Sequence, residues 1–318
     1  MRRILSIDGG GIKGVFPAAF LAAVEESVGR PTAEFFDLIV GTSTGGIVAL
    51  GLGLGLSAGE VLKFYEESGP RVFCGNPLIR GLRRIGLCKY SPGTLRDALT
   101  RHFGEQRLGD SRTRLVIPSM NLETGQVHVF KTSHHPRLER DFREFAVDVA
   151  LATAAAPTYF PTHRMAAGTP LVDGGIWANN PVGVAVVEAI GVLGWSRDDL
   201  RVLSLGCSSS PLNIGLARTV PLGLSYWAAK IVDVLMAGQS SGAMGTAQLL
   251  AGHANVMRVS PVMPAGRFRL DDPREILSLR GLGDSEARKA LPALRPLFFQ
   301  ERAEAFEPCH RLTAQYSG

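Results

Sequence analysis

The chain has 318 residues, of which 45% are hydrophobic and 20% charged, a balance that fits a globular protein with a buried core and excludes a disordered one. The formal charge of +5 suits an anionic partner such as a phospholipid surface or a nucleotide, but it is too small to indicate nucleic-acid binding. Four scattered cysteines without a Cys-x-x-Cys pair favour a reduced, cytoplasmic protein over a disulfide framework or a zinc site. The apolar run Ile4–Ile7 is too short for a signal peptide, and no run reaches the roughly 20 apolar residues of a membrane-spanning helix.

The first predicted strand, Arg3–Ile7, leads into a glycine run that matches G-x-G-x-x-G and opens a helix ending near Gly29. A dinucleotide site would need an acidic residue at the end of the second strand, whereas Glu34 and Asp37 precede that strand. Two other interpretations remain, a plain turn and an oxyanion hole made of backbone N–H groups at a helix N-terminus. The glycines of this run are Gly9, Gly10, Gly11 and Gly14.

The second predicted strand, Leu38–Val40, runs directly into Gly41-Thr42-Ser43-Thr44-Gly45, which fits the G-x-S-x-G pattern. Alone this pattern is common, but between a strand and a helix it predicts a nucleophile elbow, in which a sharp turn exposes the serine hydroxyl. Gly41 and Gly45 would give the room that such a turn needs. Ser43 is therefore the candidate nucleophile.

A nucleophilic serine needs a base. None of the seven histidines lies in a glycine-framed or strand-end turn of the kind that presents one. Asp173 follows the apolar pair Leu171-Val172 and precedes two glycines, so it should end a strand where its carboxylate could take the proton of Ser43 directly. A plain Asp-Gly turn is the alternative.

The rest of the chain alternates helices and strands, which predicts one layered α/β domain. Ser57 and Glu60 have the spacing of a capping box and should open a helix reaching about Ser68. Further elements are expected near Thr94–Phe103, Arg114–Met120, Gln126–Lys131, Arg201–Leu205, Leu222–Gly252 and Val256–Ser260, with short helices from about Pro273. We expect residues 3–206 to form a catalytic domain and residues 207–318 an extension that completes it, with a regulatory or oligomerisation role as one option.

Between Gly69 and Arg96 the chain has no acidic residue, and arginines alternate with apolar residues. A basic surface loop explains this pattern, and so does a membrane-facing flap whose arginines meet lipid phosphates. In the second case Arg80, Arg83 and Arg84 would contact the substrate or a regulator.

Together the motifs Asp8–Gly14, Gly41–Gly45 and Asp173–Gly175 resemble those of the patatin-like phospholipase family, as do the segments Ala156–Pro161 and Asn179–Pro181. The resemblance covers about residues 3–206. It implies a three-layer α/β/α fold with a mostly parallel sheet, a Ser43–Asp173 dyad in place of a triad, and hydrolysis of acyl esters of membrane phospholipids. It also implies that no metal and no cofactor is needed.

The segment Phe268–Asp272 and the helices after it look similar to bacterial patatin-like effectors of anti-phage signalling systems (CBASS-type). That similarity implies activation by a cyclic dinucleotide or trinucleotide, with Arg267 and Arg269 as candidate phosphate contacts. A cytoplasmic protein that meets the inner membrane surface when active is then expected, and it could form a homo-oligomer. The alternatives are a constitutive lipase, an esterase of the α/β-hydrolase type and a non-catalytic lipid-binding protein.

Overall fold

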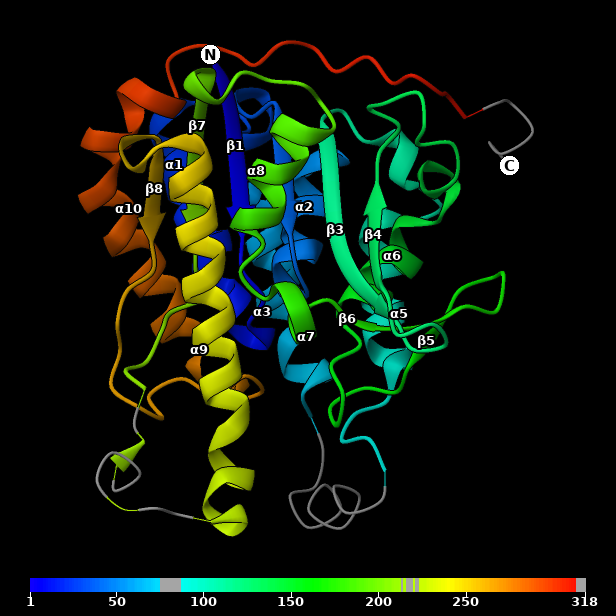
Figure 1. The fold of residues 1–318 in the computed structure, drawn as a ribbon, viewed down its shortest axis with the longest axis vertical. Coiled ribbons are helices and arrows are strands. Elements are labelled where there is room, and N and C mark those ends of the chain that lie inside the picture. Colours follow the sequence, from blue (N-terminus) through cyan, green and yellow to red (C-terminus); the bar gives the residue numbers. More distant parts are fainter. Residues whose placement is uncertain (75–86, 213, 216–219, 221–222, 313–318) are drawn as a thin grey trace.

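The computed structural model describes residues 1–74, 87–212, 214–215, 220 and 223–312 (Figure 1). Within these ranges the strands form one eight-stranded sheet in the order β5-β6-β3-β2-β1-β7-β8, with β4 paired to β3. The strands are β1 (Arg2–Ile7), β2 (Leu38–Gly41), β3 (Arg114–Asn121), β4 (Val127–Lys131), β5 (His163–Arg164), β6 (Pro170–Asp173), β7 (Leu200–Leu205) and β8 (Val256–Val259).

The centre of the sheet is parallel, because β1 pairs in parallel with β2 and β7, which in turn pair in parallel with β3 and β8. Residues Arg3–Ile7 of β1 and all of β2 are buried, as expected for strands covered on both faces. The pairs β3–β4, β3–β6 and β5–β6 are antiparallel and make up one side of the sheet. Parallel strands present their carboxyl ends at one edge, so the loops after β1 and β2 lie side by side there.

Helices cover both faces of the sheet, which makes the predicted three layers (Figure 1). On one face α8 and α9 pack over a cluster that includes Ile4, Val40 and Val202, and the larger core under α1, α2, α3 and α10 lies on the other. The helices are α1 (Val15–Val28), α2 (Thr44–Gly53), α3 (Ala58–Val72), α5 (Pro92–Phe103), α6 (Ala146–Thr153), α7 (Gly175–Ala178), α8 (Val182–Gly191), α9 (Leu224–Ala251) and α10 (Ile276–Phe298). A short 3-10 turn, Gly11–Gly14, precedes α1.

The predicted helix boundaries are confirmed where a local capping motif marks them. Ser57 and Glu60 form the reciprocal capping box at the start of α3. Gly29 caps the end of α1 with φ 72°, a left-handed conformation that glycine adopts without strain.

The short helices expected after Pro273 are wrong, because one 23-residue helix, α10, runs through Pro292 and Pro296. It packs along α1, and at Gly283 the helix backbones come so close that a Cβ would press on the backbone carbonyl of Phe16. Burial of this helix face offsets the two backbone hydrogen bonds that the prolines cannot donate.

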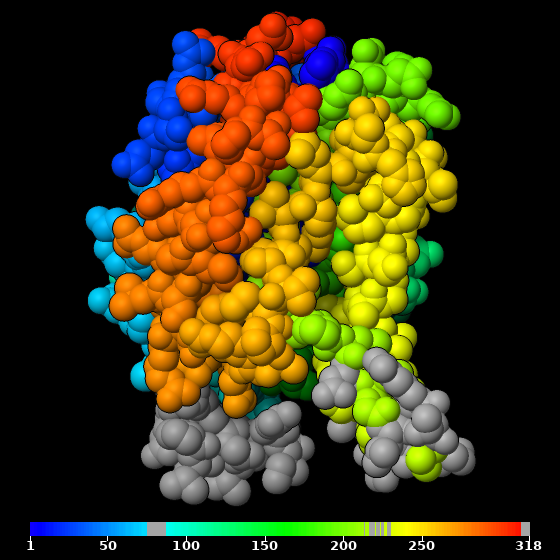
Figure 2. Space-filling model, turned by 90° about the vertical axis from the view of Figure 1, so that its left-hand side faces the viewer, coloured from blue at the N-terminus to red at the C-terminus, as the bar shows by residue number. Residues whose placement is uncertain are grey.

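Figure 2 shows α10 and α9 on either side of the edge strand β8, so all three elements from the last third of the chain lie on one side of the molecule. None of the helices in the described part of the chain combines the length and apolarity that crossing a membrane requires.

Candidate active site

Ser43 forms the turn between β2 and α2, as the sequence predicted. Its backbone has φ 56° and ψ −123°, a conformation that residues other than glycine rarely adopt. Backbone strain of this kind is found at functional sites. A Cβ at Gly41 would overlap the carbonyl oxygen of Gly45, and a Cβ at Gly45 would overlap that of Ile7. Both glycines are therefore required for this turn to close against β1.

Asp173 ends β6, which is separated from β2 by the single strand β3. The Ser43 hydroxyl donates a hydrogen bond of 2.6 Å to Oδ2 of Asp173, and the backbone N–H of Gly175 donates one of 2.6 Å to Oδ1. Ser43 is 9% exposed and Asp173 is 5% exposed, so both side chains are almost fully buried. The second glycine after Asp173 thus holds the carboxylate in position.

Burial raises the pKa of Asp173 from 3.8 to about 6, against the opposing effect of the hydrogen bonds from Ser43 and Gly175. A carboxylate with this pKa is mostly ionised at neutral pH and is still a better proton acceptor than an ordinary aspartate. The arrangement can therefore move a proton from the serine hydroxyl to the carboxylate without a histidine.

All seven histidines lie in the described part of the chain, and none of them forms a hydrogen bond with Ser43 or Asp173. His134 is buried between Thr132 and Glu188, and His163 lies 3.2 Å from Asp148. These two histidines have structural partners away from the serine.

The backbone around Ser43 is held by two threonines that the sequence interpretation missed. The hydroxyl of Thr153, on α6, accepts the N–H of Ser43 at 2.9 Å and donates to the carbonyl of Pro118 at 2.6 Å. The hydroxyl of Thr42 donates to the carbonyl of Ala178 at 2.6 Å. Thr153 is 110 residues from Ser43 in the chain, so no local pattern could have revealed its role.

The glycine loop after β1 lies against the serine turn. A Cβ at Gly9 would lie 3.2 Å from that of Ser43, and Gly14 leaves room for the Thr44 hydroxyl. The N–H of Gly9 donates to the carbonyl of Asn179 at 2.9 Å, whereas within the described ranges the N–H groups of Gly10 and Gly11 have no hydrogen-bond partner. Gly11 has φ 58°, which glycine tolerates. Two unpaired N–H groups therefore remain at the start of the helical segment beside Ser43.

The residue ahead of this loop, Asp8, is buried and forms a two-pronged ion pair with Arg258 of β8. Nη1 of Arg258 lies 2.8 Å from Oδ1 and Nη2 lies 2.5 Å from Oδ2, and Nη1 also donates to the Ser204 hydroxyl at 2.6 Å. Cys207 packs on the same loop, and burial raises the pKa of its thiol to about 12, so it stays a neutral packing residue.

The two candidate acids of a dinucleotide site do not stand at a strand end. Asp37, directly before β2, accepts the backbone N–H of Arg3 at 2.8 Å and pairs with Arg2 at 3.0 Å. This acid is a structural group in the core, and the position where a ribose-binding acid would lie is occupied by the serine turn.

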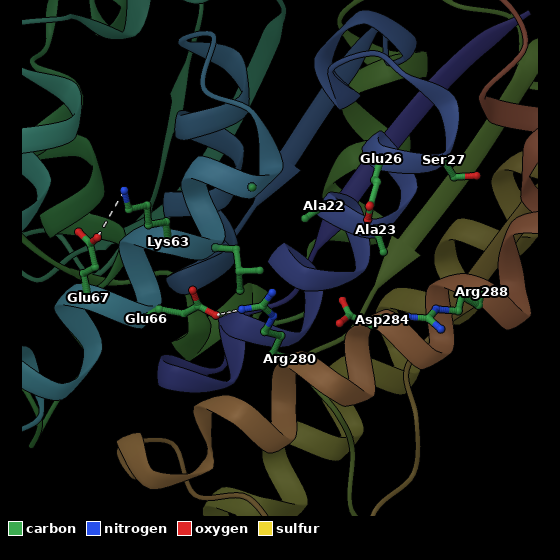
Figure 3. A pocket seen from close by; sticks show the side chains of 12 residues that line it. Ala22, Ala23, Glu26, Ser27, Lys63, Glu66, Glu67, Arg280, Asp284 and Arg288 are labelled. Atoms are coloured by element: carbon green, nitrogen blue, oxygen red, sulfur yellow. Dashed lines mark hydrogen bonds and ion pairs between the residues drawn. The ribbon is translucent and has the colours of Figure 1, made fainter.

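The predicted contacts Arg80, Arg83 and Arg84 lie outside the described residues. A cavity of about 840 Å³ opens elsewhere, between α1, α3 and α10 (Figure 3). Its wall carries the ion pair of Arg280 with Glu66 at 2.9 Å, together with Asp284 and Arg288, and neither Ser43 nor Asp173 lines it. Within the described residues no group of three or more His, Cys, Asp or Glu side chains is placed to hold a metal ion.

Comparison with known proteins places this geometry in a family. Residues 5–186 match the model of the patatin-like phospholipases. A protein of Pseudomonas aeruginosa named cGAMP-activated phospholipase is 38% identical over 240 residues, which cover 75% of this chain and 72% of that protein. Proteins with the same name from Vibrio cholerae (39% identical, 58% of this chain, 57% of that one) and Escherichia coli (36%, 64% and 61%) are also similar, though the match spans less than two thirds of their length.

Among solved structures, VipD from Legionella pneumophila overlaps with a TM-score of 0.48 and 13% identity over 92% of this chain and 67% of that one, too weak a likeness to inform function. The three motifs, the match over more than half of the chain and the relatives at 36–39% identity agree. The chain belongs to the patatin-like phospholipase family.

Proposed function

We propose that this phospholipase cleaves acyl esters of membrane phospholipids with Ser43 as nucleophile and Asp173 as its only side-chain base. The observation that carries the proposal is the 2.6 Å hydrogen bond between the strained, glycine-framed serine and a buried carboxylate. The Ser43 oxygen attacks the ester carbonyl while its proton passes to Oδ2 of Asp173. The acid then returns this proton to the departing lysophospholipid oxygen, leaving an acyl-serine that water hydrolyses by the same proton relay.

The oxyanion that forms in each step needs donors. The unpaired N–H groups of Gly10 and Gly11 support an oxyanion hole at this loop, since donors that are already positioned cost no reorganisation in the transition state. Gly9 and Gly14 contribute by letting Asn179 and Thr44 approach the loop closely. A dedicated metal or cofactor has no role in this chemistry.

We further propose that a cyclic nucleotide switches the enzyme on. The support is the name cGAMP-activated phospholipase that three relatives carry. Free access of such an enzyme to the membrane of its own cell would be lethal, which favours a restrained enzyme over a constitutive lipase.

A serine-reactive fluorophosphonate probe followed by peptide mass spectrometry tests the nucleophile. We expect labelling at Ser43, lost in Ser43→Ala. A His163→Ala variant serves as the matched control and should keep its activity; a folded but inactive histidine variant would contradict the dyad and favour a triad esterase. Absence of labelling and of hydrolysis would favour a lipid-binding protein.

Regulation is tested by incubating the purified protein with phospholipid vesicles and a panel of cyclic di- and trinucleotides, cGAMP included, with lipid products measured by mass spectrometry. We expect release of fatty acid to rise at least tenfold with an activating nucleotide. High basal release that no nucleotide alters would identify a constitutive lipase.

A further inference from the structure

Helix α9 exposes large apolar side chains on the side of the molecule that carries the active site. Ile231, Val232 and Leu235 are 41%, 63% and 63% exposed, and we call these three residues the α9 apolar surface. The opposite side of the helix packs on α8 and the sheet through residues such as Ala247 and Ala251. Three large aliphatic side chains left in water within five residues form a patch, not the single exposed residue that any protein surface carries.

The helix is also nearly free of charge. Of its 28 residues only Lys230 and Asp233 carry a charge at neutral pH. A helix that turns one side to water normally carries charged residues on that side. The composition of α9 therefore suits contact with an apolar environment better than permanent exposure to water.

The α9 apolar surface is joined to the active site by hydrogen bonds in the middle of the helix. Gln239 donates to the carbonyl of Ile176 at 3.1 Å and accepts the N–H of Asn179 at 2.6 Å. Ile176 is itself exposed and lies three residues after Asp173. Leu235 and Ile231 are one and two turns before Gln239, so the α9 apolar surface extends about 12 Å along the helix from the residue that bonds α7. Figure 1 shows this end of α9 projecting beyond α7 and beyond the carboxyl end of β1.

A second apolar point flanks the other side of the glycine loop. The carbonyl of Leu270, in the segment between β8 and α10, accepts the N–H of Ile12 at 2.8 Å, while its side chain is exposed. Arg269 beside it is exposed too. Figures 1 and 2 both place this orange segment and the first turns of α9 at the same end of the molecule.

We propose that the α9 apolar surface, with Ile176 and Leu270, is where the enzyme docks on a phospholipid bilayer. The inference rests on the proposed function: Ser43 is only 9% exposed, and a bilayer that abuts this end would bring a lipid ester to it. The apolar side chains enter the boundary between headgroups and acyl chains, and Lys230 and Arg269 meet lipid phosphates. A second copy of the chain bound here would stand between the serine and its substrate, which favours the bilayer as occupant.

Leu249, farther along α9, is a control position for substitutions in the α9 apolar surface. Ile231 and Leu249 are 18 residues, or five full turns, apart and so lie on the same side of α9. Leu249 is 77% exposed, more than Ile231, but sits about 27 Å farther along the helix, away from the active site. Ile231→Glu, Leu235→Glu and Leu249→Glu thus introduce the same charge at exposed positions of one helix, and the control position is the most exposed of the three.

The experiment measures partitioning of these variants, each in the Ser43→Ala background, onto vesicles of phosphatidylethanolamine and phosphatidylglycerol, with and without cGAMP. We expect Ile231→Glu and Leu235→Glu each to weaken binding about tenfold or more, the equivalent of losing one buried aliphatic side chain, and Leu249→Glu to leave it unchanged. With Ser43 intact, all three should hydrolyse a soluble short-chain ester at the wild-type rate.

Equal binding of the three variants, or no binding of the parent protein in either condition, would overturn the proposal. So would a fall from dimer to monomer in light scattering for Ile231→Glu with vesicle binding preserved, which would assign the surface to a second copy. Because binding is measured without turnover, its failure is distinct from failure of the dyad, which would appear as ester hydrolysis that survives Ser43→Ala.

Discussion

Replacing Asp173 by asparagine should abolish catalysis and at the same time make the protein more stable at neutral pH. The pKa of this buried carboxyl is 3.8 when unfolded and about 6 in the fold. Folding therefore favours the protonated form; the stability that this form contributes is complete below pH 3.8 and is lost as the pH rises through 6. This difference in pKa lowers the free energy of unfolding at pH 7 by about 3 kcal/mol, relative to a group that stays neutral.

Asparagine has nearly the same shape but cannot ionise. Its amide oxygen can still accept the N–H of Gly175, whereas the hydrogen bond with Ser43 must rearrange, at a cost of about 1 kcal/mol. We therefore expect Asp173→Asn to raise the free energy of unfolding by about 2 kcal/mol at pH 7.5 and to bring no gain at pH 4. Hydrolysis of a soluble ester should fall by a factor of about 1000 or more, because the serine loses its proton acceptor.

Urea unfolding at pH 4, 6 and 7.5 measures the first effect, and kcat/KM for a soluble ester measures the second. The wild-type kcat/KM should itself fall about tenfold per pH unit below pH 6. Asp37→Asn is the control, since this buried carboxylate is paired with Arg2 and the variant should lose stability at pH 7.5. A less stable Asp173→Asn, or a gain that does not shrink between pH 7.5 and pH 4, would refute the reasoning.

Three further outcomes are expected. Arg258→Leu leaves the Asp8 carboxylate buried without its cation, so the free energy of unfolding should fall by about 3–5 kcal/mol, and kcat should fall with KM little changed. Arg258→Lys should recover part of both. An unaltered kcat in folded Arg258→Leu would show that the ion pair has no effect on catalysis. Gly45→Ala places a methyl group against the backbone carbonyl of Ile7 and should prevent soluble expression or lower Tm sharply. Gly29→Ala, in open space at φ 72°, should lower the free energy of unfolding by only about 1–2 kcal/mol. Similar Tm values for both variants would argue against the tight turn. EDTA should leave ester hydrolysis unchanged, and a loss restored by calcium would contradict a metal-free mechanism.

The parts of the site that depend on neighbouring residues could be predicted from the sequence. Glycines on both sides of Ser43 permit a turn that other residues would obstruct, so the pattern carries its own structural meaning. The strand end at Asp173 and the capping box at Ser57 are likewise determined by a few neighbouring residues. Motifs of this kind can be predicted without knowledge of the fold, because neighbouring residues determine their geometry.

The supporting contacts could not be predicted in this way. Thr153 reaches Ser43 across 110 residues and Arg258 reaches Asp8 across 250, and neither residue stands in a distinctive local pattern. The single long helix α10 was missed because Pro292 and Pro296 normally end helices, and only tertiary packing outweighs that tendency. The strands β4 and β6 were predicted, but β5 and the antiparallel direction of all three were not, since pairing direction depends on partners that the local sequence does not name.

These long-range contacts decide what the last third of the chain does. Arg258 of β8 holds Asp8, the carbonyl of Leu270 holds the N–H of Ile12, and Gln239 of α9 holds Asn179, which in turn accepts the N–H of Gly9. Each contact joins residues 207–318 to a segment that borders Ser43, and β8 extends the same sheet. We therefore propose that this region completes the catalytic domain instead of being appended to it. A ligand can shift an equilibrium only through contacts that differ between two states, and an activator bound to β8, α9 or the segment before α10 would act on the glycine loop through bonds already in place.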